Sequence, residues 1–269
     1  MRARWALVAF LLIAAAACGG GSDQGSPKGS TAPPPSPSPS PEPTSSFPVL
    51  GESELRAMSD AVTFEAADGV RLDGRLFGSG DVGVVLSHMR PGDQGQWLAF
   101  AGLLADRGFR VLTYDRRGEC LGGDLGCSEG NGGDPGAWRD LASAVELLRD
   151  EGSDRVVVGG ASLGAMESLY ALSHGLEADG LIWLSGLDLY EGESIKEQVR
   201  EVRVPKLFMT GSFDSDSAPL GPALERAAPK PVEVVSLDTG EHGTDILRFG
   251  DPAVADQIRQ TVLDFLAGN

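Results

Sequence analysis

The chain has 269 residues, of which 39 are Asp or Glu and 22 are Lys or Arg, giving a formal net charge of −17. Such an acidic chain lacks the basic stripe that nucleic-acid binding requires, and its charge does not help to attract phosphorylated or other anionic substrates. Solubility is the simplest explanation of the charge excess.

The first residues have the composition of an export signal. Two arginines within the first four residues precede an apolar run at 5–13, which is too short to span a bilayer comfortably. Three alanines (15–17) then precede Cys18, which resembles the lipobox of bacterial lipoproteins, where the cysteine is lipidated and becomes the new N-terminus. Ala15 stands where leucine is usual, and these alanines also suit ordinary signal peptidase, which would release a soluble protein. We predict a signal peptide over 1–17 and lipidation of Cys18.

Residues 18–50 are expected to form a tether. They are rich in Gly, Ser, Pro and Thr and cannot bury enough apolar surface to offset the entropy of ordering. Residues 51–269 suit one α/β domain. We therefore expect export, with the lipid as the protein's one membrane contact, on the outer face of a bacterial membrane. The sequence leaves open whether the host has one membrane or two, and it leaves the oligomeric state open.

From residue 61 onward, apolar runs alternate with amphipathic ones. The patterns predict strands at 62–66, 70–77, 82–87, 110–114, 155–159, 180–184, 205–210 and 232–236, and helices at 97–105, 134–148, 166–172 and 254–266. Two opening strands followed by strand–helix units indicate an α/β fold with a mostly parallel central sheet of about eight strands and helices on both faces.

The Gly-x-Ser-x-Gly motif of residues 160–164 gives the strongest indication of chemistry. It stands between a β-branched strand and a helical pattern, where the chain turns so sharply that the positions two before and two after the serine need almost no side chain. Ser162 would then stand clear at the top of the sheet as a nucleophile. The backbone N–H of Leu163 would open the next helix, where it could donate to an oxyanion.

A serine nucleophile needs a general base, and the chain offers three histidines. His242 follows the last predicted strand and precedes the final helix, and we predict that it is the base. The competing interpretation is a surface histidine in a loop. His174 closes the helix after Ser162 and is expected to be solvated, whereas His88 ends the third predicted strand.

The acid that orients His242 is expected after one of the later strands. Asp214 is preferred, and Asp216 and Asp188 are the alternatives. Each could be an ordinary acidic loop residue in so acidic a chain. The pair Asp214 and Asp216 also suggests calcium, but the glycine and the distal glutamate of a calcium-binding loop are missing. We expect neither a metal nor a cofactor.

Cys120 and Cys127 lie in a glycine-rich loop of a chain that is predicted to be exported, so we expect a disulfide between them. It would close a small ring and stabilise the fold by roughly 2.5 kcal/mol at most on a chain-entropy argument. A metal site is the alternative, but two cysteines without a nearby histidine make a poor one. Two free thiols on the folded, unreduced protein would exclude the disulfide.

The chain order Ser162, Asp214, His242, each after a strand, resembles the α/β-hydrolase fold family. The resemblance covers nearly all of the chain after the tether and implies nucleophilic acyl transfer to water. His242 would take the proton of Ser162, Asp214 would hold the imidazole tautomer, and water would release a covalent acyl-serine.

Residues 84–88, followed by a glycine-containing loop and Trp97, are similar to the family's His-Gly oxyanion loop. The residue after His88 is Met89 where glycine is usual. By position, the resemblance implies that the second oxyanion donor is the backbone N–H of Arg90, with Met89 as the alternative. His88 itself is expected to shape the loop rather than act as the base.

Residues 113–118, followed by Ser-Glu-Gly at 128–130, resemble the family's Asp-x-Arg-Gly-x-Gly-x-Ser segment. Residues 119–127 interrupt that segment with the expected disulfide ring. This insertion could form part of one wall of the site, but we favour the interpretation that it braces an exposed loop.

The family often inserts a lid domain after the sixth strand of its core, and here only residues 185–204 are available. We therefore expect no large lid and an open site that suits short or accessible acyl esters, with amide or peptide cleavage as a further possibility. The alternative function is a non-catalytic surface binding protein of the same fold. A dinucleotide-binding enzyme is disfavoured because Gly-x-Gly-x-x-Gly is absent.

Overall fold

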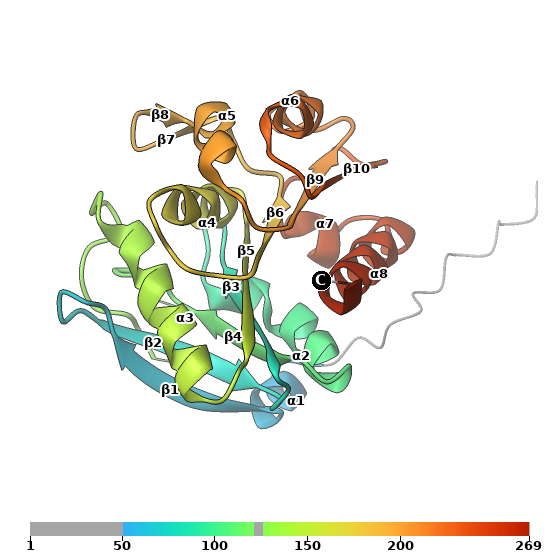
Figure 1. The fold of residues 1–269 in the computed structure, drawn as a ribbon. Coiled ribbons are helices and arrows are strands. Elements are labelled where there is room, and N and C mark those ends of the chain that lie inside the picture. The colour runs from blue at the N-terminus through green and yellow to red at the C-terminus, as the bar shows by residue number, and fades with distance from the viewer. Residues whose placement is uncertain (1–50, 121–125, 269) are drawn as a thin grey trace, which may run out of the picture. The chain divides into compact units, whose positions relative to one another are not determined.

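An eight-stranded sheet organises the computed structural model, which describes residues 51–120 and 126–268 (Figure 1). The strand order is β1-β2-β4-β3-β5-β6-β9-β10; neighbours from β4 to β10 are parallel, whereas β1 and β2 are antiparallel additions at one edge. The strands are β1 (Ser59–Glu65), β2 (Arg71–Phe77), β3 (Val82–Ser87), β4 (Arg110–Tyr114), β5 (Arg155–Ala161), β6 (Gly180–Leu184), β9 (Lys206–Gly211) and β10 (Val232–Leu237). The predicted signal peptide, Cys18 and the tether up to residue 50 lie outside the described residues.

Helices cover both faces of the sheet (Figure 1). One face packs against α1 (Glu52–Ala57), α2 (Leu98–Asp106), α7 (Asp245–Arg248) and α8 (Pro252–Gly268). The other packs against α3 (Asp140–Asp150), α4 (Leu163–Ser173), α5 (Ile195–Gln198) and α6 (Leu220–Ala227). This arrangement confirms the predicted fold class.

The central strands show why helices must cover both faces of the sheet. Val84 of β3 packs into the cluster under α2 and α8, whereas Val85, the next residue, packs under α3 and α4. Successive residues of a strand point to opposite faces, so a strand buried on both faces must be apolar throughout. The β-branched run of β5 obeys the same rule, with Val157 on one face and Val156 on the other.

All eight predicted strands are present, but the helix predicted from Asp134 was wrong at its start. The α-helix begins at Asp140, after a 3₁₀ turn at Ala137–Arg139. Instead, the Asp134 carboxylate accepts a hydrogen bond from the Gly136 N–H at 2.7 Å and forms an ion pair with Arg117 at 2.7 Å. An Asx turn followed by glycine satisfies the Asp134 side chain locally, so it does not cap the helix.

The segment between β6 and β9 agrees with the absence of a large lid. It contains the two-residue strands β7 (Leu189–Tyr190) and β8 (Glu193–Ser194), then α5 and a 3₁₀ turn at Val199–Glu201. The β7–β8 hairpin and the helices α1, α6 and α7 were not predicted. Within residues 51–120 and 126–268, no helix is both long and apolar enough to cross a membrane.

Candidate active site

A strained serine lies at the turn from β5 into α4. Ser162 has φ +50° and ψ −115°, a backbone conformation that side-chain-bearing residues rarely adopt. The two flanking glycines make this turn possible. A Cβ on Gly160 would lie 2.4 Å from the Gly164 carbonyl carbon, and a Cβ on Gly164 would lie 2.3 Å from the Ser87 carbonyl oxygen. The positions two before and two after Ser162 therefore have no room for a side chain, as expected for a nucleophile elbow.

The substitution Gly160→Ala tests this turn. Its methyl group would collide with the backbone of α4, so we expect a loss of stability of about 1–3 kcal/mol together with a displaced Ser162. Gly159→Ala is the graded control, because its methyl group would meet the Cβ of Ile182 at 3.0 Å and its carbonyl oxygen at 3.1 Å, a milder overlap than the one at Gly160. Urea unfolding and ester hydrolysis measure the two effects. If Gly160→Ala were as stable and as active as Gly159→Ala, the account of this turn would be contradicted.

His242 and Asp214 lie beside this serine at the carboxyl edge of the sheet. Nδ1 of His242, in the loop after β10, is 2.7 Å from Oδ2 of Asp214, in the loop after β9. The next residue, Gly243, lies against the elbow: a Cβ built there would be 3.8 Å from the Ser162 Cβ. The His242 side chain is 31% exposed. The structure thus joins Asp214 to His242 and places the residue after His242 against Ser162.

Asp214 is held as an ionised acceptor. Burial alone would raise the pKa of its carboxyl, but hydrogen bonds from Ser217 and His242 outweigh that effect and hold the pKa below its usual range. The Ser217 hydroxyl donates to Oδ2 at 2.6 Å, and the Asp216 N–H donates to Oδ1 at 3.2 Å. A carboxylate fixed in this way keeps its charge and orientation at neutral pH.

The two alternative acids are placed differently. Asp216 contributes its backbone N–H to Asp214, and its side chain makes no contact with His242 in the described chain. Asp188 binds Lys196 at 2.7 Å and the Ser194 hydroxyl at 2.9 Å. Of the three candidate acids, Asp214 is the one that hydrogen-bonds His242.

Of the two candidate second oxyanion donors, one is already engaged. The Met89 N–H donates to Oε1 of Gln96 at 3.0 Å, whereas the Arg90 N–H makes no hydrogen bond with the described residues. The Leu163 N–H belongs to the first turn of α4, where helical N–H groups have no partner in the helix. Among the described residues, the N–H groups of Leu163 and Arg90 therefore stay available as donors, and that of Met89 does not.

The contacts of His88 and His174 indicate structural roles for both residues. His88 is fully buried, with Nδ1 3.0 Å from the Met89 carbonyl and Nε2 3.3 Å from the Arg116 N–H. Burial, followed by the nearby charge of Arg116, lowers the pKa of His88 to about 3, so it stays neutral and joins two loops. His174 stacks on Tyr170 with ring centroids 3.9 Å apart and is a third exposed.

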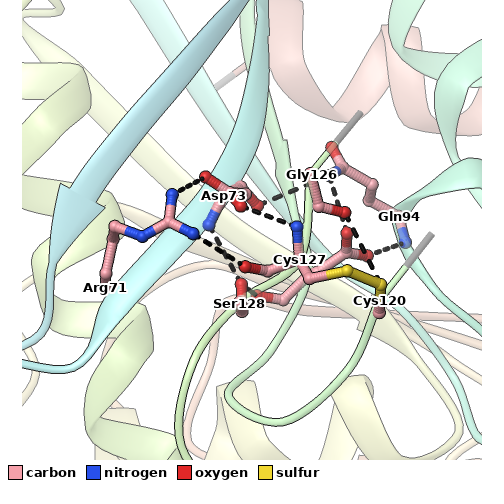
Figure 2. Close-up of a disulfide and its surroundings, with 8 residues drawn as sticks. Arg71, Asp73, Gln94, Cys120, Gly126, Cys127 and Ser128 are labelled. Carbon is pink, nitrogen blue, oxygen red and sulfur yellow. Dashed lines mark hydrogen bonds and ion pairs between the residues drawn. A yellow bond between two sulfur atoms is a disulfide. The ribbon is translucent and has the colours of Figure 1, made fainter. Parts of the chain in front are cut away.

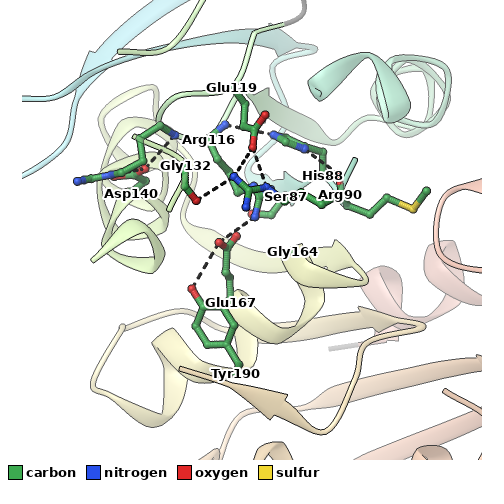
Figure 3. Close-up of polar contacts among 12 residues, drawn as sticks. Ser87, His88, Arg90, Arg116, Glu119, Gly132, Asp140, Gly164, Glu167 and Tyr190 are labelled. Carbon is green, nitrogen blue, oxygen red and sulfur yellow. Dashed lines mark hydrogen bonds and ion pairs between the residues drawn. The ribbon is translucent and has the colours of Figure 1, made fainter. Parts of the chain in front are cut away.

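A buried ion pair beside the elbow was missed by the sequence analysis. Arg116 Nη1 lies 2.9 Å from Oε1 of Glu167, and both side chains are 4% exposed. Figure 3 shows Glu167 between Arg116 and Tyr190, whose hydroxyl donates to the same oxygen at 3.5 Å. Burial raises the pKa of Glu167 although Arg116 opposes this rise. The available signal was an acidic residue inside the otherwise apolar helix that follows Ser162.

The disulfide is present between Cys120 and Cys127, with Cα atoms 4.3 Å apart (Figure 2). The Cys127 N–H donates to Asp73 of β2 at 2.7 Å, and the Ser128 hydroxyl accepts the Asp73 N–H at 2.9 Å. These contacts tie the segment after the ring to the sheet, which favours the bracing interpretation. Residues 121–125 of the ring lie outside the described residues.

In the described part of the chain, no cluster of three or more His, Cys, Asp or Glu side chains could hold a metal ion.

Comparisons with known proteins agree with this architecture. The model of the alpha/beta hydrolase family matches residues 84–267. An esterase of Pyrococcus furiosus has a TM-score of 0.65 at 19% identity, over 84% of this chain and 96% of the esterase. An esterase of Exiguobacterium antarcticum has a TM-score of 0.62 at 14% identity, over 77% of this chain and 100% of its own. A hydrolase of Pseudomonas aeruginosa has a TM-score of 0.62 at 18% identity, over 77% of this chain and 98% of that hydrolase. No curated protein matches. At these identities, the similarity to solved structures shows the fold.

Proposed function

The chain belongs to the alpha/beta hydrolase family, and on that premise we propose that it is a serine hydrolase that cleaves carboxylic esters. The observation that carries the proposal is the Asp214–His242 hydrogen bond of 2.7 Å beside a serine on a strained elbow. A nucleophile, a base and an orienting acid are the three parts that acyl transfer requires.

The geometry supports a defined role for each group. A carboxylate can only accept, so the contact with Asp214 puts a proton on Nδ1 of His242 and leaves Nε2 as the base. His242 takes the proton of Ser162 as its oxygen attacks the ester carbonyl, and the N–H groups of Leu163 and Arg90 bind the oxyanion. The imidazolium then protonates the leaving alcohol, and water hydrolyses the acyl-serine by the same steps.

The proposed substrates are short or accessible acyl esters. Support comes from the small size of the segment between β6 and β9, which leaves the serine without a large lid. We expect kcat/KM for p-nitrophenyl acetate and butyrate to exceed that for the palmitate by about tenfold or more, because no apolar lid covers a long chain. Steady-state hydrolysis of the series measures this ratio. Efficient turnover of emulsified long-chain esters but not of short ones would contradict the proposal, and cleavage of the matching anilides would extend it to amides.

We also propose export and attachment to the outer face of a bacterial membrane through lipid on Cys18. Support comes from the composition of residues 1–18 and from the Cys120–Cys127 disulfide, because disulfides persist in oxidising compartments. Metabolic labelling with a palmitate analogue should mark the wild-type protein, and Cys18→Ser should lose the label and leave the membrane fraction. An unlabelled wild-type protein in the medium would contradict the anchor.

A further inference from the structure

A small polar pocket opens beside the first turn of α4. Its volume is about 160 Å³, and its walls include Leu163, which follows Ser162 directly. The remaining side chains that shape it are mostly polar or charged: Arg90, Asp134, Glu167, Tyr190 and Glu191. A pocket next to the nucleophile is placed to receive part of the substrate, and this one offers little apolar surface to an alkyl chain.

Glu167 presents an unused acceptor to this pocket. Its Oε1 receives Arg116 at 2.9 Å and the Tyr190 hydroxyl at 3.5 Å, whereas Oε2 accepts no hydrogen bond from the described residues. The side chain is only 4% exposed and lines the pocket, so little of it is open to bulk water. A donor that enters the pocket would therefore meet an acceptor that the described residues leave unpaired.

A guanidinium donor lines the same pocket. Arg90 uses Nε and Nη2 to bind Glu119, and Nη2 also binds the Gly132 carbonyl, which leaves Nη1 without a hydrogen bond among the described residues (Figure 3). The pocket therefore combines an acceptor on Glu167 with a guanidinium donor on Arg90.

This combination selects among polar groups. An ammonium cannot accept from a guanidinium and would face the charge of Arg90, whereas a carboxylate can only accept and would face Glu167 and Glu191. A neutral hydroxyl donates to the carboxylate and accepts from a guanidinium at the same time. An alkyl chain would leave these groups unpaired, and sites built to bind a hydroxyl discriminate strongly against analogues that lack it.

We propose that this pocket is a subsite for a hydroxylated group of the substrate, so that the preferred esters are those of polyols or sugars. Glu167 and Tyr190 are its specificity-determining residues. The inference deepens the proposed ester hydrolysis and rests on it.

Four acetate esters test the proposal, because they share the acyl group and differ in the alcohol: glyceryl 1-acetate, propyl acetate, acetylcholine and 3-acetoxypropanoate. Glyceryl 1-acetate and propyl acetate share a three-carbon chain and differ by two hydroxyls. We expect kcat/KM for glyceryl 1-acetate to exceed that for propyl acetate by about tenfold or more, with both charged esters also below it. A ratio near one, or a preference for either charged ester, would overturn the proposal.

Variants of the pocket residues test whether the preference for glyceryl 1-acetate over propyl acetate depends on the pocket. Glu167→Gln should bring the glyceryl-to-propyl ratio at least about threefold closer to one, because a neutral amide accepts a hydroxyl proton more weakly than a carboxylate does. Tyr190→Phe keeps the ring and removes the hydroxyl, so it reports on the pocket even where Glu167→Gln folds poorly. The matched control is Glu225→Gln on the exposed side of α6, which should leave the ratio unchanged. A wild-type ratio in both pocket variants would overturn the assignment.

Failure of the pocket and failure of the proposed function give different results. If a fluorophosphonate labels Ser162 and propyl acetate is hydrolysed without preference for the glyceryl ester, only the pocket assignment fails. If neither labelling nor hydrolysis occurs, the hydrolase proposal fails. Ligand-observed NMR with glyceryl 1-acetate then decides the pocket: binding that Glu167→Gln removes supports it, and absence of binding overturns it.

Discussion

Replacing Asp214 by Asn is expected to lower kcat/KM for ester hydrolysis by about 10³–10⁴-fold without loss of the fold. The Asp214 carboxylate accepts from Nδ1 of His242 at 2.7 Å and stabilises the imidazolium that forms during acyl transfer. Asparagine removes the charge, and its amide N–H₂ group can donate to Nδ1, which would place the proton on Nε2. The nitrogen that should act as the base would then carry a proton.

The matched controls are Asp216→Asn and Asp188→Asn. Both acids lie in loops after strands, yet neither side chain hydrogen-bonds to His242 in the described residues. We expect each control to keep kcat/KM within about threefold of the wild type, as for substitutions away from the reacting groups. A large loss in either control, with activity retained in Asp214→Asn, would assign the acid elsewhere.

Replacing Arg117 by Leu is expected to destabilise the fold by about 3–5 kcal/mol, because it would leave a buried carboxylate without its partner. Asp140 is fully buried and receives the Arg117 guanidinium at 2.5 Å, while Asp68 and Asp134 bind the same group nearer the surface. Burial raises the pKa of Asp140, and Arg117 opposes that rise. Without Arg117 the protonated acid would be favoured, so the stability deficit should shrink as the pH falls.

Urea unfolding of two further variants checks this cause. Arg226→Leu, on the exposed end of α6, should change stability by less than about 0.5 kcal/mol, because it leaves no buried charge unpaired. The double variant Arg117→Leu/Asp140→Leu should recover part of the loss, since it removes the orphaned carboxylate. A double variant no more stable than Arg117→Leu alone would show that the guanidinium acts by packing instead of by charge pairing.

The sequence predicted the fold well because its signals are local. The β-branched run of β5 and the glycines at 160 and 164 describe a strand and a sharp turn within a few residues of one another. The elements that were missed have weak local patterns. α6 has Gly221 and Pro222 in its first turn, where proline is tolerated but hides the helical period. β7 and β8 have two residues each, too few for an alternation to be read.

The site was less predictable because its partners come from distant segments. Asp188, Asp214 and Asp216 all follow strands, and only the path of each loop places one of them against His242. The Arg116–Glu167 pair joins residues separated by 51 positions. No local pattern distinguishes Glu167 from a solvated acid, although its place among apolar residues of α4 was a hint.

The central claim is that Ser162 is an activated nucleophile, and intact mass after treatment with a fluorophosphonate probe tests it most directly. The folded wild-type protein should gain the mass of one adduct, and Ser162→Ala should gain none, because the probe reacts only with a serine whose base and oxyanion donors are in place. A folded wild-type protein without an adduct, or equal labelling of Ser162→Ala, would contradict the account and favour a binding protein with a hydrolase fold.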